Sequence, residues 1–223
     1  MTIQIEFLKA SPYFSGLNDV DLSSISKFLF EKVVDRGEII FFEGEPVGVL
    51  YFVGSGVVKI FKTSSDGKEQ ILRLVRPGES FNDVPVFSSG SNLVSAEAMG
   101  RVIFYGIKKS DVEKILRSYP QISLNIIRVL SRRVEYLVSL VEDLSFRNVT
   151  GRVAKVLLEY AGDGTSQNPR LTQQEMAAIA GTAREMVGRS LKSLDEEGTI
   201  RLDRHRIVIT NRKALQEIAG VTS

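Results

Sequence analysis

The sequence predicts an α+β protein with an N-terminal antiparallel β-roll, a long helix and a C-terminal winged helix-turn-helix. Short β-type runs separated by glycine-containing turns fill residues 38–105, which is typical of small antiparallel barrels and rolls. Residues 121–146 contain neither glycine nor proline and carry apolar residues at helical spacing. Residues 171–194 read as two short amphipathic helices separated by Gly181. We therefore expect three parts, at residues 1–118, 119–147 and 148–223.

The composition of the chain excludes several kinds of site and argues against a membrane protein. The chain has 223 residues, of which 43% are hydrophobic, enough to pack two domain cores. It has no cysteine, which excludes disulfides, thiolate metal sites and cysteine-held iron–sulfur clusters. The apolar runs are far shorter than the roughly 20 residues of a membrane span, and the N-terminus lacks a signal-peptide layout. We expect a cytoplasmic protein that does not bind membranes.

Net charge alone indicates no particular partner. The chain carries +2 overall, with 11 basic against 9 acidic residues in 148–223 and 18 against 18 before that. A nucleic-acid-binding surface would therefore have to be a local cluster of basic residues.

Residues 1–118 begin with a helical lead-in, in which Asn18 or Asp19 is suited to start a helix. The dipeptide Asp66-Gly67 lies between two apolar runs and predicts a β-hairpin. A capping box, Ser110 followed by Glu113, predicts the start of a short helix. The expected strands are residues 38–42, 49–53, 56–62, 70–75, 94–98 and 101–105.

The long helix has two apolar sides. One row follows coiled-coil spacing and comprises Ile122, Ile126, Val129, Tyr136, Leu140 and Leu144. Arg133 interrupts this row, and the sequence shows no partner for it. One apolar side can cover the roll while the other meets a twin helix; the alternative is a helix buried within one subunit. We favour a homodimer, in which this side of each helix meets its twin about a two-fold axis.

Residues 171–194 have the signals of a helix-turn-helix. Thr172 with Glu175 and Thr182 with Glu185 are two capping boxes, and Gly181 is suited to a left-handed C-cap. The buried faces are predicted to comprise Met176, Ile179 and Ala180 on the first helix, and Val187, Leu191 and Leu194 on the second.

The outward face of the second helix predicts DNA reading. Arg184 and Arg189 match the two acceptors of guanine, and Glu185 can accept from the amino group of cytosine. The alternative is that Glu185 only caps the helix, or pairs with Arg189 as an ordinary i,i+4 ion pair. Four further polar residues are expected to hold phosphates: Gln173, Gln174, Thr182 and Lys192.

A short β wing is predicted after this helix, from residues 199–202 and 206–209. Its arginines, Arg201, Arg204 and Arg206, could touch phosphates, although a solvated hairpin would look the same. The only histidine, His205, falls in this wing, which argues against its serving as a proximal haem ligand.

Three motifs in residues 148–210 resemble the DNA-binding domain of the Crp/Fnr family. They are Val149-Thr150-Gly151-Arg152-Val153-Ala154, Leu171-Thr172-x-Gln174-Glu175-Met176 and Arg184-Glu185-x-Val187-Gly188-Arg189. The resemblance implies that Arg184, Glu185 and Arg189 read a TGTGA-type palindromic half-site on double-stranded DNA. It also implies contact with RNA polymerase and a cyclic-nucleotide-binding-like fold for the N-terminal roll, with Arg36-Gly37-Glu38 and Pro77-Gly78-Glu79 at matching places.

The effector pocket departs from the family pattern. Family members that bind cyclic AMP carry a Gly-Glu pair and an Arg-Ser pair, where this chain has Asn82-Asp83 and Val94-Ser95. Val94 removes the guanidinium that would meet a cyclic phosphate, which argues against cyclic nucleotide as the effector. A loop with no ligand and a site for another small effector both remain open.

The enzyme class is disfavoured, because the sequence has no Walker-type phosphate loop, no cysteine nucleophile and no metal-ligand cluster. The leading hypothesis is a homodimeric, sequence-specific transcription regulator. The alternative is a cyclic-nucleotide sensor that acts mainly through a protein partner.

Overall fold

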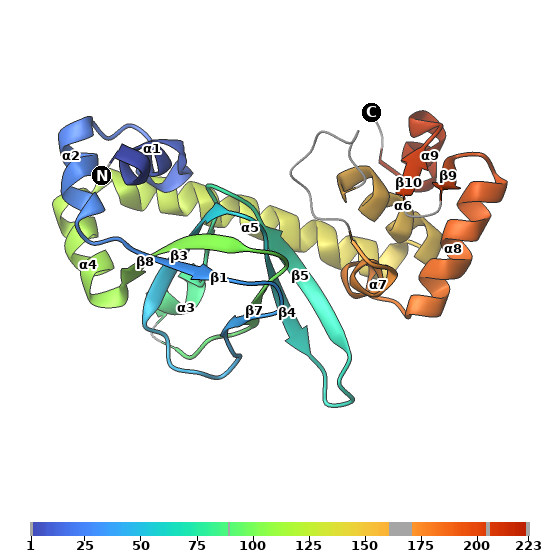
Figure 1. The fold of residues 1–223 in the computed structure, drawn as a ribbon, viewed down its shortest axis with the longest axis horizontal. Helices are drawn as coiled ribbons and strands as arrows, with labels where there is room; N and C mark the ends of the chain where they lie inside the picture. Colours follow the sequence, from blue (N-terminus) through green and yellow to red (C-terminus); the bar gives the residue numbers. More distant parts are fainter. Residues whose placement is uncertain (1, 89, 161–170, 204–205, 222–223) are drawn as a thin grey trace. The chain divides into compact units, whose positions relative to one another are not determined.

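The computed structural model describes residues 2–88, 90–160, 171–203 and 206–221 (Figure 1). The chain divides into two compact units, one of Met1–Lys62 with Arg73–Tyr136 and one of Thr63–Leu72 with Leu137–Ser223. The division falls inside the long helix α5 (Gln121–Phe146), whereas the sequence suggested boundaries at its ends; those boundaries stay a prediction.

The β-roll consists of two four-stranded antiparallel sheets, in the orders β1-β8-β3-β6 and β2-β7-β4-β5. The longest pairing joins β3 to β8, with Phe52 opposite Tyr105. The predicted hairpin is confirmed: Gly67, at φ +79°, donates to Ser64 O at 2.9 Å, a turn that favours glycine. The strands are β1 Phe30–Val34, β2 Ile39–Phe41, β3 Val49–Ser55, β4 Val58–Thr63, β5 Glu69–Val75, β6 Ser80–Phe81, β7 Ser95–Ala98 and β8 Val102–Lys108.

Two apolar clusters hold the first unit together. One lies within the roll, where the rings of Tyr51 and Phe81 stack at 5.1 Å between centroids. The other joins the helices to β3 and β8, around the fully buried Phe52. Burying one such side chain contributes about 1.5–3 kcal/mol, so these clusters are the main stabilising element of the unit.

The helices of the first unit gather around the N-terminal half of α5 (Figure 1). Asn18 caps α2 as predicted, accepting from Asp21 N at 2.9 Å. The predicted Ser110 capping box is wrong, because β8 runs directly into α4 and Lys108 is the N-cap, with no side-chain bond. The helices are α1 Thr2–Ala10, the 3₁₀ turn η1 Pro12–Phe14, α2 Asp19–Ser26, α3 Asp83–Ser88 and α4 Lys109–Ser118.

The predicted dimer row on α5 needs correction. Ile122 and Ile126 are only 2% and 7% exposed, because they pack into the core of their own subunit. Val129, Tyr136 and Leu140 are half-buried, and only Leu144 is exposed. The exposed apolar stripe lies on the opposite side of the helix and comprises Leu124, Ile127, Val134, Val138 and Val141. Both sides of α5 are apolar, so the periodicity of the sequence could not show which side packs against its own subunit and which side is exposed.

The second unit has the predicted winged helix-turn-helix. Of the side chains predicted to be buried, only Ile179 is half-buried; the others are buried, namely Met176, Ala180, Val187, Leu191 and Leu194. The wing pairs Ile200 with Ile209 across two antiparallel strands. The elements are α6 Val149–Tyr160, α7 Gln173–Ala180, α8 Arg184–Glu196, β9 Ile200–Asp203, β10 Arg206–Ile209 and α9 Arg212–Ile218. Among the described residues, no helix combines the length and apolar character needed to cross a bilayer.

Candidate nucleic-acid interface

Helix α7 has the start and the end that the sequence predicts. Thr172 Oγ1 accepts from Glu175 N at 3.1 Å, and the Glu175 carboxylate accepts from Thr172 N at 2.6 Å, so the capping box is complete. Gly181 ends the helix at φ +62°, a left-handed conformation that costs glycine little. The next amide, Thr182 N, donates to Ala177 O at 3.0 Å and closes the turn. These bonds fix the direction in which α8 leaves.

Helix α8 does not begin with the predicted capping box of Thr182 and Glu185. Its N-cap is Ala183, in extended conformation and without a side-chain hydrogen bond. Thr182 is instead part of the turn after Gly181, one residue too early to cap. The carboxylate of Glu185 is therefore not used in capping.

The three predicted base-reading residues lie together on the outer surface of α8. Arg184, Glu185 and Arg189 are all exposed, and they fall with Lys192 within about 140° of helical arc at 100° per residue. The opposite side of α8 is buried through Val187, Leu191 and Leu194. Packing of that side presents the charged side to solvent.

The alternative interpretation of Glu185 and Arg189 as an ion pair is not supported. Within the described part of the chain, the ion pairs include Lys192 with Glu196, N to O 3.6 Å, but not Glu185 with Arg189. Arg189 Nη1 instead lies 4.0 Å from the sulfur of Met186. The charged ends of Arg189 and Glu185 therefore do not neutralise each other.

The predicted phosphate-holding residues flank this surface. Gln173 and Gln174 form the exposed first turn of α7, where helix N–H groups favour anions. Thr182 is half-buried in the turn, and Lys192 is exposed two turns into α8. The structure thus places Gln173, Gln174 and Lys192 on the two helices of the motif and Thr182 in the turn between them.

An arginine of α6 supports the motif, a role that sequence reasoning missed. Arg152 Nε donates to Ala180 O at 2.7 Å, and Arg152 Nη1 donates to Arg147 O at 2.6 Å. On α6, the hydroxyl of Thr150 lies 3.2 Å from that of Ser190 on α8. Arg152 was visible only as part of a family motif, because its acceptor lies 28 residues away.

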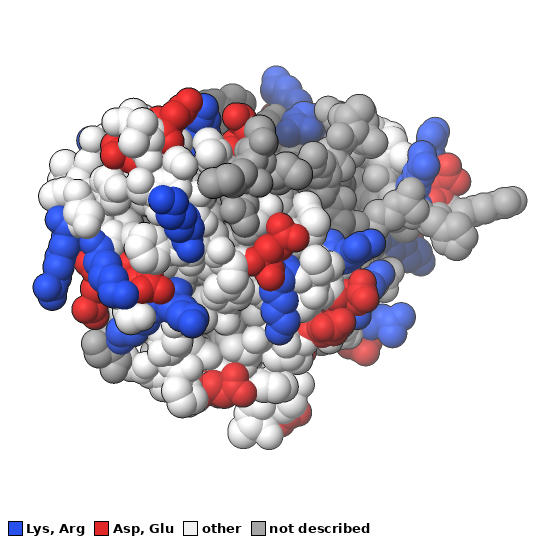
Figure 2. All heavy atoms as spheres, turned by 60° about the vertical axis from the view of Figure 1, so that its left-hand side comes forward, with Lys and Arg blue, Asp and Glu red and all other residues white. Residues whose placement is uncertain are grey.

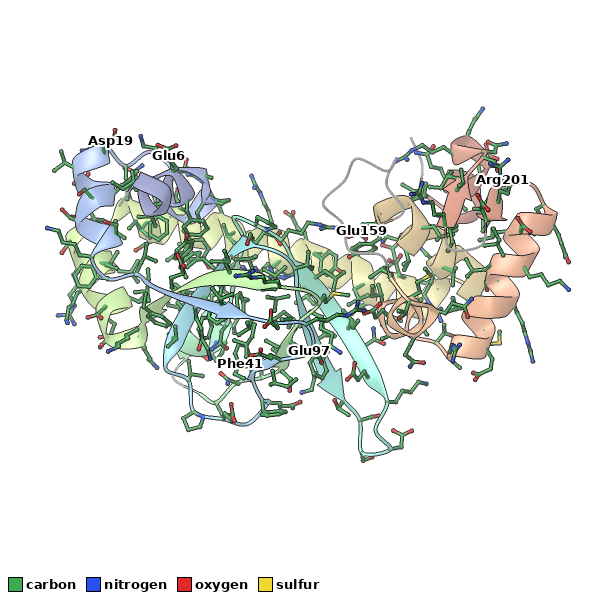
Figure 3. All side chains as sticks on the ribbon, viewed as in Figure 1. Glu6, Asp19, Phe41, Glu97, Glu159 and Arg201 are labelled. Carbon is green, nitrogen blue, oxygen red and sulfur yellow. The ribbon has the colours of Figure 1, made fainter. Side chains whose placement is uncertain are left out.

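The wing is attached to α8 by short polar contacts. Leu202 N donates to Asp195 Oδ1 at 3.0 Å, and Thr199 Oγ1 donates to Leu194 O at 2.8 Å. Arg201, labelled in Figure 3, and Arg206 are exposed on the wing strands. The predictions for Arg204 and His205 concern residues outside the described part of the chain.

The predicted effector residues all contact other parts of the first unit. Asn82 has φ +64°, in the left-handed region, where the family pattern has glycine. Asp83 is 3% exposed and accepts from Tyr13 Oη at 2.5 Å, from Ser80 Oγ at 2.9 Å and from Arg133. Val94 packs against the core of the roll, and Ser95 Oγ accepts from the backbone amide of Glu43 at 3.0 Å.

The charges around Asp83 are strongly coupled. Burial acts to raise the pKa of its carboxyl, but Arg133, the Tyr13 hydrogen bond and Arg73 together hold that pKa below its ordinary value. The pKa of the Tyr13 hydroxyl is raised, first by burial and then by the charge of Asp83, so it stays a neutral donor. Arg133 thus finds the partner that the sequence did not show.

Metal binding finds no support in the side chains that the structure places. The described residues contain no group of three or more histidine, cysteine, aspartate or glutamate side chains arranged to hold a metal ion.

Comparison with known families assigns both units. Residues 31–119 match the cyclic nucleotide-binding domain, and residues 151–218 match the Crp-like helix-turn-helix domain. These two matches cover the roll and the interface described above.

Curated relatives match over nearly the whole chain. The chain is 32% identical to the cyclic AMP receptor protein of Thermus thermophilus, over 95% of this chain and 98% of that protein. It is 31% identical to the CRP-like cAMP-activated global transcriptional regulator of Mycobacterium tuberculosis, over 94% of this chain and 97% of that protein. The structure of FixK2 from Bradyrhizobium japonicum superposes with a TM-score of 0.75 at 25% identity, over 87% of this chain and 99% of that chain. The chain therefore belongs to the Crp/Fnr family and is a DNA-binding, non-enzymatic transcription regulator with an effector-type N-terminal domain.

Proposed function

We propose that this regulator binds as a homodimer to a TGTGA-type palindromic site. Arg184 and Arg189 donate to guanines in this proposal, and Glu185 accepts from cytosine. The supporting observation is that these three side chains are exposed together on α8, while the opposite side of the helix is buried.

Phosphate contacts position the reading helix. Gln173 and Gln174 at the start of α7, with Thr182 and Lys192, act at the flanking backbone. Acidic and basic side chains are interspersed over the face that Figure 2 shows, and the whole chain carries a net charge of only +2, so net charge alone does not account for this binding. The exposed polar and charged side chains on α7 and α8 support DNA binding instead.

In a homodimer, the α8 helix of the second subunit would bind the second half-site. The exposed stripe on α5, through Ile127, Val134, Val138 and Val141, is apolar over more than three helical turns. A second copy of the same helix would bury it in a two-fold contact. Family members are homodimers, and half-sites lie about one DNA turn, roughly 34 Å, apart.

Two parts of this proposal rest on family membership. Contact with RNA polymerase is one of them. A regulatory role for the roll is the other, because the relatives in T. thermophilus and M. tuberculosis carry cyclic AMP in their names.

The test is selection of bound sequences from a random DNA pool by the full-length protein, with and without cyclic AMP. We expect an inverted repeat of TGTGA-type half-sites, and loss of enrichment when Arg184, Glu185 and Arg189 are all replaced by alanine. Arg212→Ala, which removes an exposed arginine from α9, is the matched control and should enrich the same repeat.

Enrichment of no sequence by the wild-type protein would contradict the proposal. If cyclic AMP then bound in a calorimetric titration, the rival hypothesis of a sensor acting through a protein partner would gain support.

A further inference from the structure

We propose that the Arg133–Asp83 ion pair takes the place of an effector in this chain, so that the regulator binds DNA without a cyclic nucleotide. The inference rests on the proposed DNA-binding function and specifies how its effector-type domain is set. Both residues lie in the first unit, 50 positions apart.

The carboxylate that would meet a ligand is already occupied. Asp83 accepts from Tyr13 Oη and Ser80 Oγ on one oxygen, and Arg133 Nη1 contacts the other. Asp83 is 3% exposed, so these donors replace water around it. A ligand hydroxyl would have to displace one of them to reach the carboxylate.

Arg133 binds two elements of the roll at once. Its Nη2 donates to Ser80 O and to Ser80 Oγ, both at 2.7 Å, while its Nη1 contacts Asp83 at the start of α3. Charge-assisted and forked contacts of this kind are directional as well as strong. They tie the middle of α5 to both β6 and α3.

The residues at the family's phosphate-side positions make contacts within the chain itself. Val94 is half-buried and packs against the roll core, and the hydroxyl of Ser95 accepts from the backbone amide of Glu43. Arg73 is the remaining guanidinium near Asp83, and its Nη2 donates to Ser80 O at 2.6 Å. Ser80 O thus accepts from Arg73 and Arg133 together, which leaves both guanidiniums engaged by the protein.

These contacts of Arg133 with Asp83 and Ser80, here called the clamp, hold α5 in the orientation that the packing of Ile122 and Ile126 selects. Arg133 directly precedes Val134, one of the residues of the exposed stripe, so the clamp resists rotation of the helix about its axis at the stripe. An internal ion pair therefore helps to keep the stripe exposed. In an effector-dependent regulator, a bound ligand would supply this stabilisation instead.

The experiment compares full-length wild type, Asp83→Asn, Arg133→Gln and their double variant. Arg132→Gln is the matched control, because Arg132 is an exposed arginine of the same helix. The readouts are affinity for the selected DNA without added nucleotide, affinity with cyclic AMP or cyclic GMP, and self-association by sedimentation. Circular dichroism checks that each variant is folded.

We expect wild type and Arg132→Gln to bind without nucleotide, and to change less than about twofold when nucleotide is added. Each clamp variant should lose at least about tenfold in DNA affinity and in self-association, and the double variant should lose little more than one single variant, because the two residues act through each other. Arg133→Lys should lose less DNA affinity and self-association than Arg133→Gln, because lysine keeps the positive charge.

Two results would overturn the inference while leaving DNA binding intact: a wild type that binds only with nucleotide, or clamp variants that behave like Arg132→Gln. A wild type that binds no DNA under any condition would contradict the proposed function. Sedimentation of the same variants would then still decide whether the clamp controls α5.

Discussion

Arg152 Nε donates a 2.7 Å hydrogen bond to the carbonyl oxygen of Ala180, so an arginine of α6 caps the C-terminal end of α7. A helix leaves its last carbonyls without intrahelical partners, and a cation there also favours the helix dipole. The same guanidinium reaches Arg147 O at 2.6 Å. One side chain therefore joins the residues before α6 to the turn that directs α8.

Replacing this arginine should weaken DNA binding from a distance. We expect Arg152→Ala to lower the free energy of unfolding by about 1–3 kcal/mol, because two partly buried hydrogen bonds to backbone carbonyls are lost. Chemical denaturation of the full chain and a gel shift on the selected site measure both effects. Arg212→Ala, an exposed arginine on α9, is the control and should change neither by much. Equal effects in the two variants would show that Arg152 does not support the motif.

Gly181 provides a second test of the turn. Alanine at φ +62° is strained by about 1–2 kcal/mol, and its Cβ would lie 2.5 Å from Leu144 Cδ2. Gly198 is the matched control, because its φ is +72° but no atom lies within 4 Å of the corresponding Cβ. We expect Gly181→Ala to destabilise the protein more than Gly198→Ala in denaturant titrations. Equal losses would mean that the Leu144 side chain moves aside without cost.

Sequence reasoning succeeded where the determining contacts are local. The Thr172–Glu175 box spans three residues, and the Gly181 cap depends on one backbone conformation, so both could be predicted. The same pattern failed at Thr182, because the left-handed turn at Gly181 moves the start of α8 beyond it. A capping motif therefore predicts a helix start only when the preceding turn places its first residue at the N-cap position.

Sequence reasoning failed where the contact is distant. The two apolar sides of α5 look alike, and only packing against Phe14 and Ile25 of the first unit selects the side with Ile122. Arg133 finds Asp83 across 50 residues of chain, which periodicity cannot show. The exposed surface on α8 could be predicted, because one helix carries all three residues that are predicted to read bases.

The ion pair of Asp83 should make stability depend on pH in the acid range. Its folded-state pKa is lowered, while an unfolded aspartate titrates near about 3.9. The ionised form therefore stabilises the fold fully above about pH 5, and this contribution is lost as the pH falls through the folded-state pKa. At pH 7, Asp83→Asn should reduce the free energy of unfolding by about 3–5 kcal/mol, because it leaves a buried guanidinium unpaired.

The difference between wild type and Asp83→Asn should shrink as the pH falls below about 4. Urea titrations at pH 7, 5, 4 and 3 measure it. Asp19→Asn on the exposed surface of α2 is the control, and it should show a small difference at every pH. A difference for Asp83→Asn that stays constant over this range would contradict the assignment of the charged pair.

The exposed stripe of α5 predicts where dimerisation can be broken. Val138 is 63% exposed in the single subunit, so Val138→Asp should not disturb the subunit core. A buried charge at a two-fold contact occurs twice, and we expect the dimer to dissociate at least about a hundredfold more readily, some 2.7 kcal/mol. Sedimentation of the full chain measures this. Arg132→Asp places the same side chain on α5 outside the stripe and should leave the dimer largely intact.

Base reading and phosphate holding can be separated on α8 itself. Arg184→Ala should cost about 1–3 kcal/mol on the selected site and relax the preference at one base position, because a bidentate contact to guanine is lost. Lys192→Ala should weaken specific and random DNA alike and reduce the slope of log affinity against log salt by about one for each subunit. Fluorescence anisotropy over a salt series on both DNAs distinguishes them. If both variants lost affinity equally on specific and random DNA, Arg184 would hold phosphate, and the reading surface would have to begin beyond the first turn of α8.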